Sequence, residues 1–354
     1  NPDPRAGGEN SVFSTLDTTS YAAFGEMSYD LTASTILTAG VRYTHDELEF
    51  EAEQVPIGSN LRPALFVDDS VTAEEPTYRL ALQQDISENV NLYASYNRGF
   101  KSGTYSMSSI LVEPVEPQKI DAYEVGMKSQ LLEDRLRLNL AAFRYEISDY
   151  QVRSATGGSP TAILLNAAEV EIDGLELEFE AAPADNLRLF GAVTWLDAEF
   201  ADFPYAPFTY PRPAVCTPGG SAPGMSTGSP TGGLTTCIGS GDGNETPLAP
   251  EYAGNLGATY TLAMGSAGEM DFSVLYTYND GYYFEADNRL EQPDFSTVNA
   301  SISYRPTPNW AVELWGRNLD DEPYNVQNLA LSSLGDNGIP AAPRTYGLNL
   351  KYTY

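Results

Sequence analysis

The last nine residues of the chain read YGLNLKYTY, residues 346–354, and this stretch decides the fold. Every second residue is apolar or aromatic, and glycine or polar residues stand between them. Successive side chains of a β-strand point to opposite faces, so the segment has one apolar face and one polar face. The same period of two recurs in residues 175–180, 187–195 and 298–304, which predicts an all-β protein of half-apolar strands.

Thirteen such strands are predicted along the chain. They cover residues 16–29, 34–50, 74–86, 89–101, 118–131, 135–151, 163–182, 186–199, 250–264, 269–285, 294–305, 309–319 and 343–354. Short and long connections alternate, and the long ones are 51–73, 102–117, 152–162, 200–249, 286–293 and 320–342. In an up-and-down barrel successive turns lie on opposite rims, and outer-membrane barrels keep the periplasmic turns short while the extracellular loops grow.

This alternation predicts a transmembrane antiparallel up-and-down β-barrel in a bacterial outer membrane. We expect its apolar side chains to contact lipid, its polar side chains to line the lumen, its long loops to be extracellular and its C-terminus periplasmic. On this interpretation Glu176, Glu178 and Glu180 line a wet lumen instead of forming a carboxylate ladder for cations. The alternative is a soluble β-sandwich whose apolar stripes form the core.

Two of the predicted strands change phase along their length. Within 135–151 the apolar positions switch face near Ala141, and within 163–182 they switch at Gly174. An extra residue in one strand shifts the alternation by one, and glycine is common at such places. The sequence therefore predicts a β-bulge at each switch.

Composition excludes several other classes of protein. Although 42% of the residues are hydrophobic, no stretch approaches the roughly 18 apolar residues of a membrane helix. The formal net charge of −30 argues against nucleic acid as a partner, because phosphate binding needs clustered Lys and Arg. His45 is the single histidine and no nucleophile–base pair stands out, so we predict no enzyme, no metal site and no cofactor.

The long connection 200–249 contains both cysteines, Cys216 and Cys237, within a stretch rich in Gly, Ser, Thr and Pro. No metal-ligand spacing surrounds them. A disulfide that closes this loop is the prediction, and it implies an oxidising compartment. The alternative is two free thiols.

Aromatic residues in the long connections are the candidates for ligand contact, because such rings can stack on sugars, catechols or planar chelates. They are Tyr105, Tyr205, Phe208, Tyr210, Tyr282, Tyr283 and Tyr324. The alternative for each ring is packing within a loop or a place in the aromatic girdle of the barrel.

Several segments, in order along the chain, resemble the barrel of TonB-dependent receptors of the iron-complex type. Residues 97–103 (NRGFKSG), 117–118 (PQ) followed by 122–128 (AYEVGMK), 170–178 (VEIDGLELE) and 316–324 (GRNLDDEPY) are similar to motifs of that family. The departures from the usual residues are Asn97 for Ser, Gln118 for Glu and Asp320 for Phe.

The resemblance implies a barrel of about 22 strands around a plug domain, of which residues 1–354 are the C-terminal portion. An antiparallel barrel closes only with an even number of strands, so thirteen strands cannot close and are expected to be part of a larger barrel. On this resemblance the plug, the TonB-binding box and about nine strands are absent from this sequence. The aromatic Tyr354 resembles the end recognised by the barrel assembly machinery.

The function that the resemblance implies is TonB-coupled import of a scarce extracellular small molecule across the outer membrane, with the TonB complex acting through the absent plug. A ferric siderophore or other iron complex is the expected ligand. The alternatives are the same machine importing an oligosaccharide, cobalamin or an aromatic compound, and a passive porin or non-transporting barrel.

Overall fold

The structure is a computed structural model, and it describes residues 9–57, 64–107, 113–155, 162–167, 169–211, 214–216, 223–225, 234–331 and 335–353. Its main element is a 13-stranded antiparallel sheet in which the strands follow one another in chain order. These strands are β1 (Glu9–Thr32), β2 (Thr35–Ile57), β3 (Leu65–Ser87), β4 (Val90–Lys101), β5 (Gln118–Leu131), β6 (Leu136–Ser148), β9 (Glu169–Ala184), β10 (Leu187–Asp202), β15 (Tyr252–Ala263), β16 (Glu269–Tyr283), β17 (Glu291–Thr307), β18 (Trp310–Arg317) and β21 (Thr345–Tyr352). The predicted thirteen-stranded up-and-down arrangement is confirmed.

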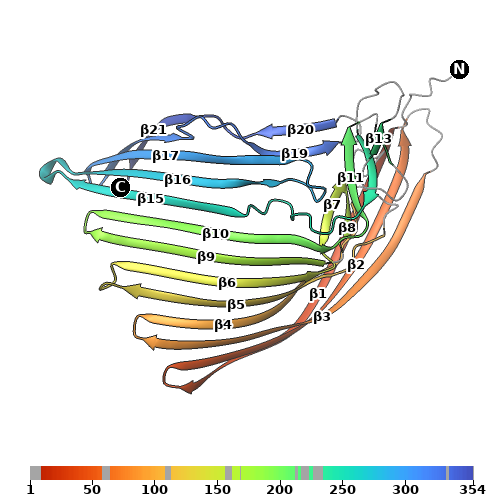
Figure 1. Ribbon diagram of the computed structural model, residues 1–354, viewed down its shortest axis with the longest axis horizontal. Helices are drawn as coiled ribbons and strands as arrows, with labels where there is room; N and C mark the ends of the chain where they lie inside the picture. The colour runs from red at the N-terminus through yellow and green to blue at the C-terminus, as the bar shows by residue number, and fades with distance from the viewer. Residues whose placement is uncertain are drawn as a thin grey trace.

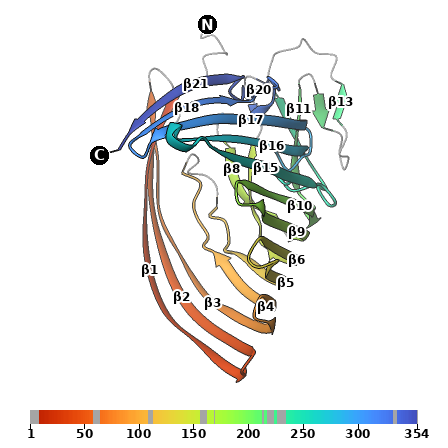
Figure 2. The same ribbon diagram turned by 90° about the vertical axis from the view of Figure 1, so that its left-hand side faces the viewer.

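The sheet is a curved wall whose two edges are β1 and β21, which lie on opposite sides in Figure 1. Figure 2 shows that the wall bends into an open trough. Among the described residues there is no helix with the length and apolar character that a membrane crossing needs.

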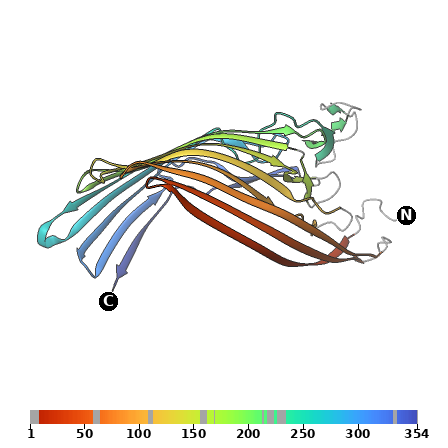
Figure 3. The ribbon, with the colours of Figure 1, turned by 90° about the horizontal axis from the view of Figure 1, so that it is seen from below.

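Short and long connections lie at opposite ends of the sheet, as the sequence predicted. Figure 3 shows the tight turns together at one end and the loop strands at the other. In the turn after β15, Gly268 has a φ of 91°, and a Cβ there would lie 2.0 Å from the Arg305 carbonyl oxygen. This position of the turn therefore requires glycine.

The register gives the sheet one apolar face and one polar face. A row of paired residues on the apolar face, from β1 to β10, is Tyr29, Leu37, Leu82, Ala94, Val125, Ala142, Leu175 and Trp195. A row on the other face, from β4 to β17, is Asn91, Lys128, Asn139, Glu178, Ala192, Asn255, Thr277 and Thr297. We call these the outer face and the inner face. The large apolar side chains of the outer face are exposed, as in a wall that meets lipid.

The two predicted β-bulges are wrong. The pairing of β6 with β9 runs without a shift from Leu136 opposite Ala181 to Ser148 opposite Glu169. The strands keep their phase, and the polarity of the two faces exchanges instead. Beyond Ala142, towards the long loops, the outer face carries Arg144 and Glu146.

The inner face becomes apolar over the same stretch because loops cover it. Ile147, Val170 and Phe200 are 7%, 1% and 0% exposed, and they pack with Phe203 and Ala206 of the connection after β10. Water reaches the outer face of this stretch, and loops exclude it from the inner face. The exchange of polarity therefore needs no extra residue.

Several predicted boundaries also change. The predicted strand 163–182 is divided, because β8 (Ala162–Asn166) pairs with β7 (Gln151–Ala155) before β9 begins. The predicted connection 51–73 is mostly strand, since β2 and β3 continue well beyond their predicted ends.

Two of the other long connections, 200–249 and 320–342, contain hairpins of their own. The structure places two of them between β10 and β15 and one between β18 and β21. Their strands are β11 (Ala206–Pro211) with β14 (Leu234–Gly239), β12 (Ala214–Cys216) with β13 (Pro223–Met225), and β19 (Asn325–Leu331) with β20 (Gly335–Pro340).

Candidate functional site

The inner face of the wall is polar, and some of its charges form ion pairs. Arg137 and Arg188 both form ion pairs with Glu180, and the Arg137 contact measures 3.6 Å. The Asn139 amide donates a hydrogen bond to Glu178 over 3.4 Å. Side chains of this kind suit a water-lined passage, and they bear out the inward position expected for the glutamates of β9.

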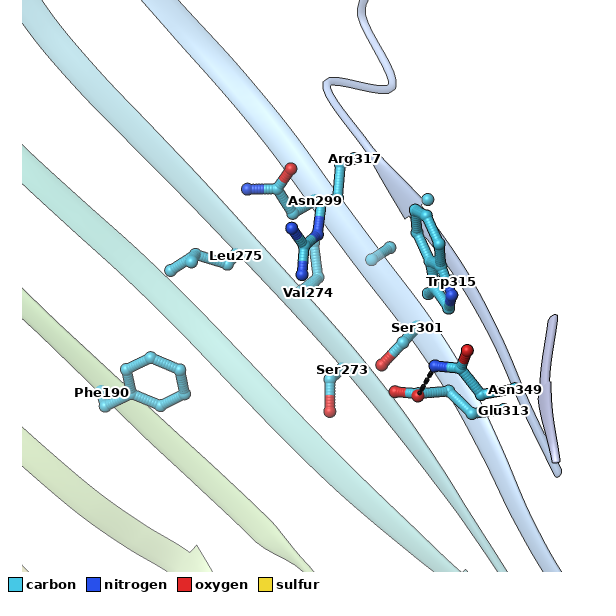
Figure 4. A pocket seen from close by; sticks show the side chains of 12 residues that line it. Phe190, Ser273, Val274, Leu275, Asn299, Ser301, Glu313, Trp315, Arg317 and Asn349 are labelled. Carbon is cyan, nitrogen blue, oxygen red and sulfur yellow. Dashed lines mark hydrogen bonds between the residues drawn. The ribbon is translucent and has the colours of Figure 1, made fainter. Parts of the chain in front are cut away.

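A hollow of about 430 Å³ lies on the inner face near the C-terminal edge of the sheet (Figure 4). Within it the Asn349 amide donates to Glu313 over 2.9 Å, and the Arg317 guanidinium lies 5.5 Å from the centre of the Trp315 ring. Amides, hydroxyls, a carboxylate and an indole thus face the same space, and together they can bind polar groups by hydrogen bonds and stacking.

Aromatic rings of the inner face lie against glycines of the next strand. A Cβ at Gly347 would come 2.5 Å from the Trp315 ring, and a Cβ at Gly257 would come 2.2 Å from the Phe190 ring. These glycines are required for close approach of a ring, and the rings fill the gap that each glycine leaves. The sequence analysis missed these pairs, although a glycine in mid-strand was an available signal.

The long loops meet at a charged junction. Asp287, in the connection between β16 and β17, accepts hydrogen bonds from the Thr209 backbone amide and hydroxyl at 2.9 and 2.7 Å. Arg289 forms a bidentate pair with Asp336 of β20 at 2.7 and 2.8 Å, and its guanidinium also donates to Thr209. We call these four residues the loop junction. It connects hairpin β11–β14 to hairpin β19–β20.

Glu285 lies beside this junction and accepts a hydrogen bond from the Ala330 amide over 3.1 Å. Burial raises the pKa of its carboxyl, and the nearby carboxylates of Asp287 and Asp336 raise it further. Burial acts to lower the pKa of Arg289, but the hydrogen-bonded carboxylate of Asp336 outweighs it and the pKa is raised. Arg289 therefore stays charged and holds two acidic loops together.

The connection after β10 is held by a disulfide and by a tight turn. Cys216 and Cys237 are joined by a disulfide across the β11–β14 and β12–β13 hairpins. The Phe203 amide donates to Asp242 over 2.6 Å, and this bond lowers the pKa of the Asp242 carboxyl. These two constraints shape the loop whose apolar residues cover the inner face.

The seven aromatic candidates differ in burial and in what they contact. Tyr105 is 4% exposed and stacks on Phe50 with ring centres 4.6 Å apart. Burial, assisted by the nearby carboxylate of Asp69, raises the pKa of Tyr105 to about 12. Tyr324 stacks on Phe295 at 4.3 Å. Both rings serve the packing of their loops in this structure.

Of the other five candidates, four are partly buried and one is exposed. Phe208 packs against the loop core, and Tyr210 follows it on the same hairpin strand. Tyr282 meets Phe284 edge-on at 5.2 Å, and its neighbour Tyr283 ends β16. Tyr205 is 77% exposed. The structure brings these five rings to the long-loop end of the sheet.

Sequence reasoning did not anticipate the loop junction. Thr209 and Asp287 are 78 residues apart, and Arg289 and Asp336 are 47 apart. Each residue is an ordinary loop residue in its own segment, so no local pattern marks it. Among the described residues, no cluster of three or more His, Cys, Asp or Glu side chains is arranged to hold a metal ion.

The curated proteins that resemble this chain include receptors. A probable TonB-dependent siderophore receptor, PiuA of Acinetobacter baumannii, is 24% identical over 306 residues, covering 83% of this chain and 36% of the relative. The pesticin receptor of Yersinia enterocolitica is 22% identical over 339 residues, covering 94% of this chain and 43% of the relative. The chain thus spans less than half the length of these relatives.

Solved structures show the same fold. The ferric yersiniabactin uptake receptor FyuA from Yersinia pestis superimposes with a TM-score of 0.77 at 18% identity, covering 97% of this chain and 47% of that one. The family model described as "TonB dependent receptor-like, beta-barrel" matches residues 1–319. With the wall, its two faces and its loop hairpins in place, this match shows that the chain belongs to the β-barrel family of TonB-dependent receptors.

Proposed function

We propose that this protein imports a ferric siderophore or another iron complex across the bacterial outer membrane, with energy supplied through TonB. The long-loop end faces the outside of the cell, and the end of β21 faces the periplasm. Residues 1–354 form the C-terminal portion of the receptor barrel, and TonB acts through an N-terminal plug of the full-length receptor. Tyr354, the proposed signal for the barrel assembly machinery, lies outside the described residues.

One observation carries this proposal: the faces of the strands exchange polarity along their length. Over most of its height the wall is apolar outside and polar inside, which suits lipid on one side and water on the other. Towards the long loops the inner face is covered by ordered hairpins and the outer face is charged. A receptor needs both parts, a wet passage and a structured mouth over it.

The choice of ligand is supported by the relatives and by the rim. PiuA is described as a siderophore receptor, and FyuA as a ferric yersiniabactin uptake receptor. In our proposal the exposed ring of Tyr205 and the partly buried rings of Phe208, Tyr210 and Tyr283 contact the ligand, because aromatic rings stack on planar chelating groups. Tyr105 and Tyr324 contribute by holding the loops that carry them.

Uptake of radioactive iron tests the proposal. The full-length receptor is expressed in an iron-starved outer-membrane host that lacks its own siderophore receptors, with and without the host's tonB gene. We expect uptake of a ferric siderophore from a panel of catecholate, hydroxamate and mixed-ligand types, and its loss without TonB or after addition of a protonophore. Uptake that persists without TonB indicates a passive barrel and contradicts the proposal.

The same cells distinguish the other ligands of this receptor class. Oligosaccharides, cobalamin and small aromatic compounds are offered as competitors at concentrations well above that of the ferric complex. One result would assign a different ligand to the receptor: a competitor is taken up in a TonB-dependent way and none of the iron complexes is.

A further inference from the structure

The outer face of the sheet is not uniformly filled. A hollow of about 650 Å³ lies across five neighbouring strands, β4, β5, β6, β9 and β10, which run side by side in Figure 1. Its walls are exposed apolar side chains of the outer face. They are Leu92, Val125, Leu140, Leu175, Leu177 and Val193.

A small residue creates this hollow. Ala142 lies in the register row between Val125 and Leu175, and the next row sets Leu140 opposite Leu177. A methyl group does not reach as far from the sheet as the branched side chains around it, so the surface dips at Ala142. The volume falls within the range of roughly 300–1,000 Å³ that is typical of small-molecule sites.

The hollow ends in polar groups on the side of the long loops. The rings of Tyr96 and Tyr123 lie 5.2 Å apart, and the Tyr96 hydroxyl donates to Asp121 over 2.6 Å. Arg98 pairs with the same carboxylate at 3.1 Å. This arrangement of tyrosines followed by charged groups is the one that marks a membrane–water boundary on a barrel.

The same boundary continues across β6, β9 and β10, where it is again formed by an aromatic ring and charged groups. The Trp195 indole lines the hollow and donates to Glu251 over 3.3 Å. Arg144 lies two residues beyond Ala142 and pairs with Asp173 at 3.1 Å. The hollow is therefore apolar along its length and has hydrogen-bonding and charged groups at one end only.

We propose that this hollow binds one acyl chain of a membrane lipid in a defined position, with the lipid headgroup at the level of Tyr123 and Arg144. The inference rests on the membrane orientation given under Proposed function. The hollow is continuous with the outer apolar face, so the surrounding solvent is lipid and an acyl chain is the occupant at hand. A lipid fits both features, because its acyl chain matches the apolar length and its headgroup matches the single polar end.

Trp195 reports on the site. The experiment uses the full-length receptor with every other tryptophan replaced by Phe, including Trp310 and Trp315, purified in detergent. A phospholipid with brominated acyl chains is titrated in, since bromine quenches indole fluorescence on contact. We expect quenching that saturates as the lipid is added, with competition by the same lipid without bromine.

Filling the hollow separates a site from ordinary lipid contact. Ala142→Phe places a ring where the chain lies, and we expect binding to weaken by about tenfold because the added group clashes with the ligand. Ala142→Leu is a milder second variant in case the first assembles poorly, and folding of each is checked by its heat-dependent shift on a gel. The matched control is Ala258→Phe, a small outer-face residue on β15 that does not line the hollow.

The outcomes are distinct. Saturable quenching that is lost with both Ala142 variants and kept with the Ala258 control supports the site. The site is overturned if quenching rises in proportion to lipid without saturation, or if the Ala142 variants leave it unchanged. It is also overturned if self-association of the receptor protects Trp195 from quenching. Iron uptake is measured in the same variants: a receptor that loses lipid but still transports iron shows that the two proposals stand separately.

Discussion

The two halves of the strand pair β6–β9 carry the same kinds of side chain in opposite arrangements. On the short-turn side of Ala142, Leu140 and Leu177 point outward and Asn139 and Glu178 point inward. On the long-loop side, charged groups such as Arg144 point outward and apolar groups point inward. The type of a side chain alone does not decide which face of the sheet it takes. The surroundings of each face decide it, and polarity exchanges where the surroundings of the outer face change from lipid to water.

The largest effect is expected where the inner face is covered by loops. Phe200→Ala removes a ring that is 0% exposed and leaves a cavity, so the free energy of unfolding should fall by about 3–5 kcal/mol. Urea titration of the barrel in vesicles measures it, and hydrogen exchange should rise in hairpins β7–β8 and β11–β14. Val193→Ala on the outer face is the control, since lipid fills the space that the smaller side chain leaves. An equal fall in the free energy of unfolding for Val193→Ala would contradict the difference between the loop-covered inner face and the lipid-facing outer face.

The next largest effect tests the lipid-facing half. Leu256 and Asn255 are neighbours on β15 that face outward and inward. Leu256→Arg places a charge in the apolar band and should cost about 2–4 kcal/mol, whereas Asn255→Arg places the same charge in the wet lumen and should cost much less. The same urea titration compares them. Similar costs for the two variants show that the assigned faces are wrong.

A smaller effect is expected at the loop junction. Arg289→Ala leaves Asp287 buried with only the Thr209 and backbone partners, which should cost about 1–3 kcal/mol of local stability. Hydrogen exchange of β11 and β20 measures the opening of the two hairpins. Arg344→Ala, which removes an exposed pair with Asp321 at 3.5 Å, should change exchange little. If both variants leave the hairpins closed, the junction does not hold the loops.

The smallest effect is a dependence on pH. Because the pKa of Glu285 is raised in the folded state, its contribution to stability is fully present below the ordinary glutamate pKa of 4.5 and is lost as the pH rises through the folded pKa. Glu285→Gln keeps an acceptor for the Ala330 amide and removes the titration. The protection of hairpin β19–β20, measured against the intrinsic exchange rate at each pH, should therefore vary less with pH. The exposed Glu291→Gln variant should retain the wild-type profile. If the Glu285→Gln variant keeps the wild-type dependence of hydrogen exchange on pH, another titrating group causes that dependence.

The strand order and the two faces were predictable because each strand carries its own pattern. The run from Leu187 to Trp195 alternates within nine residues, and its face follows from that alternation alone. The alternation of short and long connections likewise predicted which connections lie at each end of the sheet. The bulges were predicted wrongly at Ala141 and Gly174, because the prediction treated the surroundings of a strand as constant along its length.

The loop strands were not predictable for a different reason. β8 looked like the start of β9, since its apolar residues continue a local pattern, and only packing over the inner face shows that it belongs to a separate hairpin. The aromatic candidates were identified by position. Local sequence could not separate Tyr105, which stacks on Phe50, from Tyr205, which is exposed.

The sequence by itself determined the order of the strands and, in a strand with one continuous apolar stripe such as Leu187 to Trp195, the face that each residue takes. This follows because a strand's two faces are set by residues only two positions apart. The tertiary structure decided where polarity exchanges, which loops meet at Asp287 and Arg289, and where the outer face is hollow. These features depend on groups brought together from distant parts of the chain and on what surrounds the sheet. No local pattern carries that information, since the same side chain is stable inward or outward according to whether lipid, water or a loop lies next to it.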